Sequence, residues 1–163
     1  MSTSSKSGAG LVPSILDRLS DDHPDLSSEV YTSPSEERRR FRQSVYRDLT
    51  FLLNYRRADA DIPAEFKRIR MSVLAYGIPD FSSFDLTNKE DQKNICRGIE
   101  TAIRLFEPRL TRVSVQQPSS DDISRRLHFR LEAWLRLGAE TEPARFRASL
   151  ARDSRRFEVA GED

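Results

Sequence analysis

Apolar residues in the first third of the chain recur at the spacing of an α-helix. Ser35 is a suitable N-cap residue, and the acidic side chains of Glu36 and Glu37 favour the first turn of a helix. We therefore expect a long helix from this point to about Arg57. Its apolar face comprises Phe41, Val45, Leu49, Leu52 and Leu53.

A second helical pattern begins at Ile62 and Pro63. Its apolar face comprises Phe66, Ile69, Val73 and Leu74. Residues 76–79, Tyr-Gly-Ile-Pro, end the segment because glycine and proline both interrupt helices. The pattern predicts a second amphipathic helix that is closed by a turn at residues 77–81.

A third helix is predicted after residues 87–90, Thr-Asn-Lys-Glu, which have the form of a capping box. Its apolar positions are Ile95, Ile99, Ala102, Ile103 and Phe106. Pro108 ends this helix because proline has no backbone N–H to donate and crowds the preceding turn.

Beyond Pro108 the apolar period falls from about 3.6 to 2, which is typical of half-buried strands. Residues 111–115 and 127–137 alternate between apolar and polar, and segments 145–150 and 156–159 are joined by a hairpin turn at Asp153 and Ser154. One face of the longest segment carries Leu127, Phe129, Leu131, Leu135 and Leu137. Helices followed by strands predict an α+β fold, in which N-terminal helices pack on a small C-terminal antiparallel β-sheet.

The chain divides into two parts by composition. Residues 1–34 are rich in Ser, Gly, Asp and Pro, which predicts a flexible N-terminal arm with a short helix near residues 13–19. Residues 35–160 have enough apolar positions for a single domain with one core. A free arm of this kind commonly docks on a neighbour.

The charge balance argues against a strongly basic nucleic-acid binder, because the formal net charge of the 163 residues is only +1. Arginine accounts for 23 of the 27 basic residues and lysine for 4. Arginine suits protein interfaces because its planar guanidinium makes several hydrogen bonds at once. A GC-rich coding bias would give the same composition.

The single cysteine, Cys96, allows no internal disulfide and is typical of a reducing compartment. No apolar run approaches the roughly 20 residues that a membrane span requires, and the first residues lack the apolar region of a signal peptide. We therefore expect a cytoplasmic protein without direct membrane insertion.

Catalytic and ligand-binding patterns are weak. His23 and His128 lie far apart with no cysteine beside them, so we expect no metal site, and the sequence has no glycine-rich phosphate loop. A glycosidase needs two carboxylates across a cleft, and Glu100 with Glu107 would be the pair to test. Solvated helical acids are far commoner than catalytic pairs, so we expect neither an enzyme nor a cofactor.

A basic cluster at residues 38–42, Arg-Arg-Arg-Phe-Arg, has the chemistry to bind nucleic-acid phosphates. It follows Glu36 and Glu37 on an amphipathic helix, where ion pairs at i,i+4 on a solvated face are the more common arrangement. No aromatic stacking platform accompanies it. We therefore expect no nucleic-acid partner.

Glu107, Pro108 and Arg109 lie where the third helix gives way to the first strand. Proline fixes the direction in which the chain leaves the helix, and two opposite charges flank it. Such a junction is suited to docking a partner. The alternative is that Glu107 and Arg109 pair with each other or with a helix end.

Four segments together resemble the TssE family, whose members are baseplate wedge subunits of the bacterial type VI secretion system. Residues 44–54, SVYRDLTFLLN, resemble a helix of that family, and residues 72–81, SVLAYGIPDF, are similar to its next motif, with Ile78 where leucine is usual. Residues 106–110, FEPRL, match its Glu-Pro-Arg signature, and residues 16–19, LDRL, are similar to its short opening helix. The resemblance covers about residues 11–160.

The resemblance implies a kinship with the small wedge proteins of contractile phage tails, in which helices pack on a small antiparallel sheet. It implies that the chain joins the baseplate subunits TssF and TssG and offers a platform on which the TssB/TssC sheath begins to polymerise. Glu107, Pro108 and Arg109 would engage the helical core bundle of the wedge. An exposed strand edge within residues 144–159 would receive the sheath by strand addition.

The family resemblance leaves two alternatives to a secretion-system subunit. One is the wedge protein of a contractile phage tail or of a related injection machine. The other is a lysozyme-like glycosidase, for which no residue of the sequence gives independent support.

Overall fold

The computed structural model describes residues 11, 14–19, 33–57, 62–63, 65–118, 126–151 and 153–162. Within the predicted N-terminal arm it places a short helix, α1, at Ile15–Leu19. Most of the rest of that arm lies outside the described residues, as does the linker at residues 119–125.

The long N-terminal helix, α2, spans Pro34–Asn54. Its N-cap is Ser33 rather than the predicted Ser35, and the Ser33 hydroxyl accepts a hydrogen bond from the backbone N–H of Glu36 at 3.3 Å. Pro34 explains the difference, since proline is favoured in the first helical turn and moves the start of the helix two residues upstream. The apolar face of α2 is buried as predicted.

The second long helix, α4, spans Lys89–Phe106 and ends just before the Glu-Pro-Arg signature, as the sequence predicts. Its cap is Asn88, whose side chain accepts a hydrogen bond from the backbone N–H of Glu90 at 2.8 Å. Thr87, the expected capping residue, instead donates to the carboxylate of Asp85. The capping box is therefore replaced by an asparagine cap one residue later.

Four antiparallel strands follow in the order β1-β2-β3-β4: Leu110–Gln116, Arg126–Leu137, Glu140–Ala151 and Phe157–Glu162. The pairs Leu131 with Phe146 and Leu150 with Phe157 set the register of the last three strands. The register of β1 against β2 shifts between Thr111 and Ser114. The predicted α+β class, with helices before a C-terminal antiparallel sheet, is confirmed.

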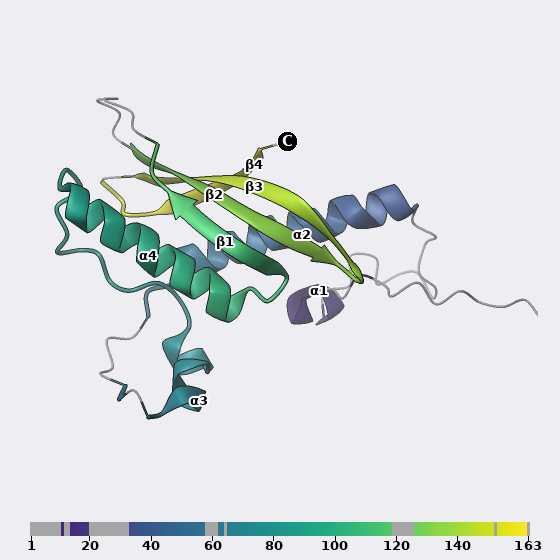
Figure 1. Ribbon diagram of the computed structural model, residues 1–163, viewed down its shortest axis with the longest axis horizontal. Helices are drawn as coiled ribbons and strands as arrows, with labels where there is room; N and C mark the ends of the chain where they lie inside the picture. Colours follow the sequence, from purple (N-terminus) through teal and green to yellow (C-terminus); the bar gives the residue numbers. More distant parts are fainter. Residues whose placement is uncertain are drawn as a thin grey trace, which may run out of the picture.

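The helices α2 and α4 and the sheet enclose one core (Figure 1). Along β2, every second residue from Leu127 to Leu137 is buried, and the residues between them are exposed or half-buried. One face of the sheet is therefore covered by the helices and the other faces solvent. The largest fully buried side chains come from both layers: Leu49, Leu52, Leu53, Ile95, Ile99, Ile103, Phe129, Leu131 and Leu135.

The predicted second amphipathic helix is wrong. The structure has only the four-residue helix α3, Lys67–Arg70, and a turn of 3-10 helix, η1, Val73–Ala75. Ser72 separates them, because its hydroxyl donates to the Ile69 carbonyl at 2.7 Å and accepts from the Leu74 N–H at 3.3 Å. The apolar residues of this segment are exposed: Phe66 49%, Ile69 37%, Val73 82% and Leu74 62%.

This segment projects from the body of the domain (Figure 1). We call residues 65–76 the α3 arm. Its base is closed by a short parallel bridge, in which the Arg57 N–H donates to the Ile78 carbonyl at 2.9 Å and the Ile78 N–H donates to the Tyr55 carbonyl at 3.0 Å. Gly77 makes this approach possible, because its φ is +105° and a Cβ there would lie 2.4 Å from the Tyr55 carbonyl oxygen.

Neither α2 nor α4, nor any other helix among the residues that the structure describes, has the length and apolar character needed to cross a membrane.

Candidate functional site

The Glu-Pro-Arg signature forms the corner between α4 and β1. Glu107 caps α4, and its backbone N–H donates to the Ile103 carbonyl at 2.9 Å. Pro108 follows and is exposed, and the Leu110 N–H donates back to the Glu107 carbonyl at 3.0 Å. This tight turn fixes the three residues in one conformation where the chain enters the sheet.

Arg109 lies at the centre of a buried ion-pair cluster. Its Nε donates to Glu107 Oε1 at 2.6 Å and its Nη2 donates to Asp48 Oδ2 at 2.6 Å. Its Nη1 donates to Ser44 Oγ at 3.0 Å, and its guanidinium carbon lies 5.6 Å from the centroid of the Phe41 ring. We call Ser44, Asp48, Glu107 and Arg109 the junction cluster.

The cluster is nearly closed to solvent, since Glu107 is 4% exposed and the Arg109 side chain 13%. Burial acts to lower the pKa of the Arg109 guanidinium, but hydrogen bonds from it to Glu107 and Asp48 and attraction to both carboxylates outweigh burial. The net shift of the Arg109 pKa is upward. Arg109 is therefore held as a cation between two carboxylates, and the cluster binds the α4–β1 corner to α2.

The ion pairs continue from the junction cluster to α1. Arg47 contacts Asp48 Oδ1 at 3.0 Å and Asp17 Oδ1 at 2.6 Å, and Ser14 donates to the other oxygen of Asp17 at 2.8 Å. Burial acts to raise the pKa of the Asp17 carboxyl, but the hydrogen bonds from Arg47 and Ser14 outweigh it, so the net shift is downward. The short N-terminal helix is thereby attached to the same face of α2.

Sequence reasoning found Glu107, Pro108 and Arg109 and placed them correctly at a helix-to-strand corner. The structure adds Ser44 and Asp48 from α2, which the sequence analysis had not linked to the signature. Phe41, Ser44 and Asp48 are spaced three and four residues apart, so they share one helical face. The signal that could have linked them to the corner was the position of Ser44 and Asp48 beside the apolar stripe of α2.

Pairing between Glu107 and Arg109, one of the two arrangements considered from sequence, is present in the structure. This pairing does not test the other expectation, which is that the three residues bind a partner. At this corner Pro108 is exposed and a small part of the Arg109 side chain is accessible.

The two carboxylates considered for glycosidase chemistry are both engaged by arginine. Glu107 accepts hydrogen bonds from Arg109, and Glu100 is paired with Arg104 one turn further along α4. A general acid must carry a proton and reach the substrate, whereas Glu107 is buried and accepts hydrogen bonds. Among the described residues, no group of three His, Cys, Asp or Glu side chains is arranged to hold a metal ion.

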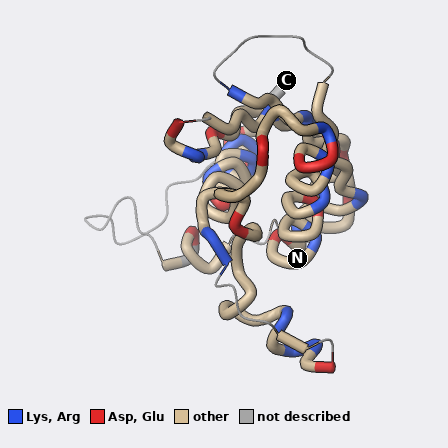
Figure 2. The backbone as a smooth tube through the Cα atoms, turned by 90° about the vertical axis from the view of Figure 1, so that its left-hand side faces the viewer, with Lys and Arg blue, Asp and Glu red and all other residues tan. Residues whose placement is uncertain are grey.

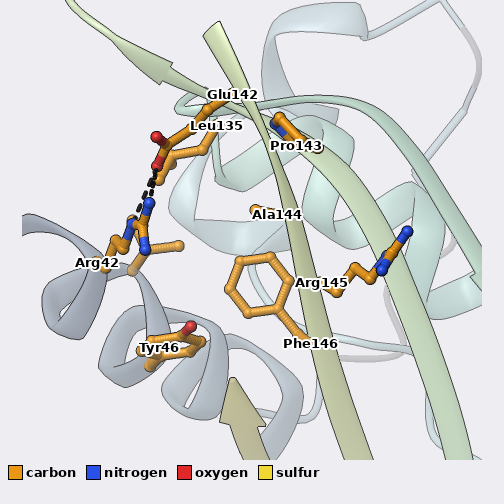
Figure 3. Close-up of a pocket in the computed structure, with 9 residues that line it drawn as sticks. Arg42, Tyr46, Leu135, Glu142, Pro143, Ala144, Arg145 and Phe146 are labelled. Atoms are coloured by element: carbon orange, nitrogen blue, oxygen red, sulfur yellow. Dashed lines mark hydrogen bonds and ion pairs between the residues drawn. The ribbon is translucent and has the colours of Figure 1, made fainter. Parts of the chain in front are cut away.

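A separate pocket lies between α2 and β3 (Figure 3). It has a volume of about 240 Å³, and Arg42, Tyr46, Pro143 and Phe146 line it. An ion pair between Arg42 and Glu142, at 2.6 Å, crosses one side. The pocket lies where β3 continues past its pairing with β4, since β4 pairs only with residues 145–150 of β3.

Comparison with known families identifies the chain. The model of a family described as baseplate wedge protein gp25 matches residues 39–140. This chain belongs to the gp25 baseplate wedge family. The match contains most of α2, all of α4, the Glu-Pro-Arg corner and the β1–β2 half of the sheet. A search among curated proteins finds no match.

The resemblance to TssE is thereby confirmed at the level of the family, because TssE belongs to the gp25 family. Membership supports a structural role in a baseplate, in contact with other baseplate proteins. The family is one of structural baseplate proteins and is not known for enzymatic activity. The junction cluster lies inside the matched region, so the feature singled out from sequence belongs to the part of the chain that the family shares.

Proposed function

We propose that this gp25-family protein is the TssE-type baseplate subunit of a bacterial type VI secretion system. It acts in the cytoplasm, docks on the wedge formed by TssF and TssG, and offers a platform for assembly of the TssB/TssC sheath. The observation that carries the proposal is the Glu-Pro-Arg corner, held rigid by the junction cluster and flanked by three further segments that resemble TssE.

Docking on TssF and TssG is assigned to Glu107, Pro108 and Arg109. The two charged side chains hold the corner in shape from within, and Pro108 presents an exposed apolar ring beside Arg109. A corner fixed before binding loses little conformational entropy when a partner covers it. The core bundle of the wedge would therefore contact Pro108 and the accessible edge of Arg109.

Co-purification from cells that express the chain with TssF and TssG tests this docking. Pro108→Asp adds a charge at an exposed position without removing a member of the junction cluster, and we expect recovery of TssF and TssG to fall at least about tenfold. Ser154→Asp is the matched control, because Ser154 is exposed at the β3–β4 turn, at the opposite end of the sheet. Equal thermal midpoints must first show that both variants fold.

Recovery of TssF and TssG with Pro108→Asp at the wild-type level would remove Pro108 from the interface. Loss of recovery with both variants would indicate a general defect rather than a local contact. Failure of the wild-type chain to bind TssF and TssG would contradict the proposed function as a whole.

The sheath platform is assigned to the outer edge of β4. Within the nominated residues 144–159, positions 145–150 of β3 pair with β2 on one side and β4 on the other, so they have no edge to offer. Phe157 begins β4, and its backbone N–H and C=O bond to the Asn54 side chain at 2.9 and 2.8 Å. Strand alternation then turns the backbone groups of Val159 and Gly161 to the same outer edge.

A contractile phage tail is the second candidate setting, because the description of the matched family, a baseplate wedge protein, suits both machines. The protein chemistry of docking would be the same in both. Neighbouring genes distinguish them: genes for TssB, TssC, TssF and TssG favour the secretion system, whereas phage head and tail-fibre genes favour a prophage.

A further inference from the structure

The α3 arm exposes apolar side chains that the sequence pattern would place in a core. Met71 is 67% exposed, in addition to Phe66, Val73 and Leu74 described above. Scattered exposed apolar residues are ordinary on protein surfaces, but a contiguous group on one projecting segment is typical of an interaction site. The apolar side chains that the sequence pattern groups together therefore lie at the surface of the arm.

Backbone hydrogen bonds hold most of the arm in shape, and burial contributes only near its end, at Ala75 and Tyr76. The Ile69 N–H donates to the Phe66 carbonyl at 3.1 Å, and the Ala75 N–H donates to the Ser72 carbonyl at 3.0 Å. The Arg70 guanidinium donates to the Ile62 carbonyl at 3.0 Å. Together with the bridge at its base, these bonds present the apolar side chains in a set arrangement before any partner binds.

The base of the arm adjoins the Glu-Pro-Arg corner. Tyr55, Tyr76 and Phe106 form a row of edge-to-face rings, with centroids 5.5 Å apart for the first pair and 5.3 Å apart for the second. Phe106 is the last residue of α4 and directly precedes Glu107. Burial raises the pKa of the Tyr76 hydroxyl, and the nearby charges of Asp48 and Glu107 raise it further. The base of the arm is therefore joined through these rings to the end of α4, two residues before Pro108.

The charge of the arm restricts the partner. Lys67, Arg68 and Arg70 are exposed, and Glu65 is the one acid within residues 65–76. Figure 2 shows the basic positions along this projecting segment. Within the part of the chain that the structure describes, neither Lys67 nor Arg68 is ion-paired. A surface that combines apolar side chains with unneutralised positive charge is complementary to an acidic amphipathic segment.

We propose that the α3 arm docks an acidic amphipathic segment of a baseplate partner, as a second contact beside the Glu-Pro-Arg corner. Apolar side chains of that segment cover Val73 and Leu74, and its carboxylates pair with Lys67 and Arg68. The inference rests on the proposed function, because the partner is a component of the wedge. A membrane surface fits less well, since α3 has four residues and is too short to lie in a lipid interface as an amphipathic helix.

Two variants test the two halves of this contact. Val73→Asp/Leu74→Asp removes the apolar half, and Lys67→Glu/Arg68→Glu reverses the charged half. Both are measured by titrating the purified, intact chain against the purified TssF–TssG complex, and we expect each to weaken binding at least about tenfold. The matched control for charge is Arg130→Glu/Arg147→Glu, two exposed positions that pair across β2 and β3 on the solvent face of the sheet.

A photo-crosslinking amino acid at Val73 in the assembled complex identifies the segment that covers the arm. Crosslinks to a TssF or TssG segment rich in Asp, Glu and apolar residues support the inference. Crosslinks only to a basic segment or to a second copy of this chain overturn it. A second result also overturns it. In that result the wild-type chain sediments with vesicles of anionic lipid, and the Lys67→Glu/Arg68→Glu variant does not sediment with them but still binds TssF–TssG.

The outcomes separate this inference from the proposed function. If the wild-type chain binds TssF–TssG and both arm variants bind equally well, the arm contact is wrong and the proposed function stands. If the wild-type chain does not bind TssF–TssG, both are wrong. If Pro108→Asp weakens binding to TssF–TssG and each arm variant also weakens it on its own, both contacts are supported.

Discussion

Arg109 and Asp48 form an ion pair across 61 residues of sequence, with Nη2 and Oδ2 2.6 Å apart. One lies just before the first strand and the other on the first long helix. Their contact joins the two layers of the fold at the corner where the family signature lies. The stability of the domain and the shape of its proposed docking corner therefore depend on the same few charges.

Replacing Glu107 by Gln will destabilise the domain. The substitution keeps the shape of the side chain but leaves Arg109 with one carboxylate in a largely buried site, and removing one partner of a buried ion pair costs about 3–5 kcal/mol. Urea unfolding monitored by circular dichroism measures the change. Glu36→Gln is the control, because the Glu36–Arg39 pair lies at the exposed start of α2 and its loss leaves the midpoint nearly unchanged.

The pKa of Asp17 reports the attachment of α1 to α2. Because its folded-state pKa lies below the ordinary value of 3.8, the carboxylate contributes stability above that pH, and this contribution is lost as pH falls through the folded-state pKa. Arg47→Ala removes the principal partner, so Asp17 will titrate at a higher pH than in the wild type. Carbon-13 NMR of the carboxyl group measures the titration. Arg39 contacts Glu36 and not Asp17, so Arg39→Ala should leave the Asp17 pKa unchanged.

Gly77→Ala will open the base of the α3 arm. Alanine at φ +105° is strained, and its Cβ would collide with the Tyr55 carbonyl, so we expect a loss of about 2–3 kcal/mol. Gly138→Ala is the control, because Gly138 also has a positive φ, of 63°, but among the described residues no atom is found to collide with a Cβ at this position. Chemical denaturation of the two variants should rank Gly77→Ala as the less stable, and equal losses would contradict the role assigned to the close approach.

Proline substitution distinguishes the two edges of β4. Val159→Pro removes a backbone N–H that points away from β3, so the sheet keeps its bonds and the domain should fold, while strand addition at the outer edge is blocked. Ala160→Pro removes an N–H that points toward β3 and should destabilise the domain. Fluorescent TssB in cells should form sheaths with the wild-type chain but not with Val159→Pro. Sheath assembly by a folded Val159→Pro variant would exclude this edge as the platform.

Local patterns predicted the parts of the fold that local physics determines. The 3.6-residue period located α2 and α4, and the two-residue period located β2, because both repeats follow from backbone geometry. Pro108 marked the end of α4 because of its missing N–H. Cap positions were off by one or two residues, since neighbouring serines, threonines and asparagines compete for the same backbone groups.

Two features depend on tertiary structure and were not accessible from local patterns. The contact of Arg109 with Asp48 requires knowledge of how α2 lies against the β1 corner. The α3 segment has the apolar spacing of a core helix, but periodicity does not tell whether an apolar face packs on its own chain or on another one. The error at Phe66, Val73 and Leu74 arose because apolar spacing alone shows neither how far a helix extends nor whether its apolar side chains are covered.

The closed base of the α3 arm separates the length of the arm from the stability of the domain. Because two backbone hydrogen bonds hold the ends of the arm together, a change in its length alters only the closure entropy of a loop, by about 0.6 kcal/mol for a doubling. Insertions among the exposed residues of the arm, away from the buried Ala75 and the half-buried Tyr76, are therefore expected to leave the core intact.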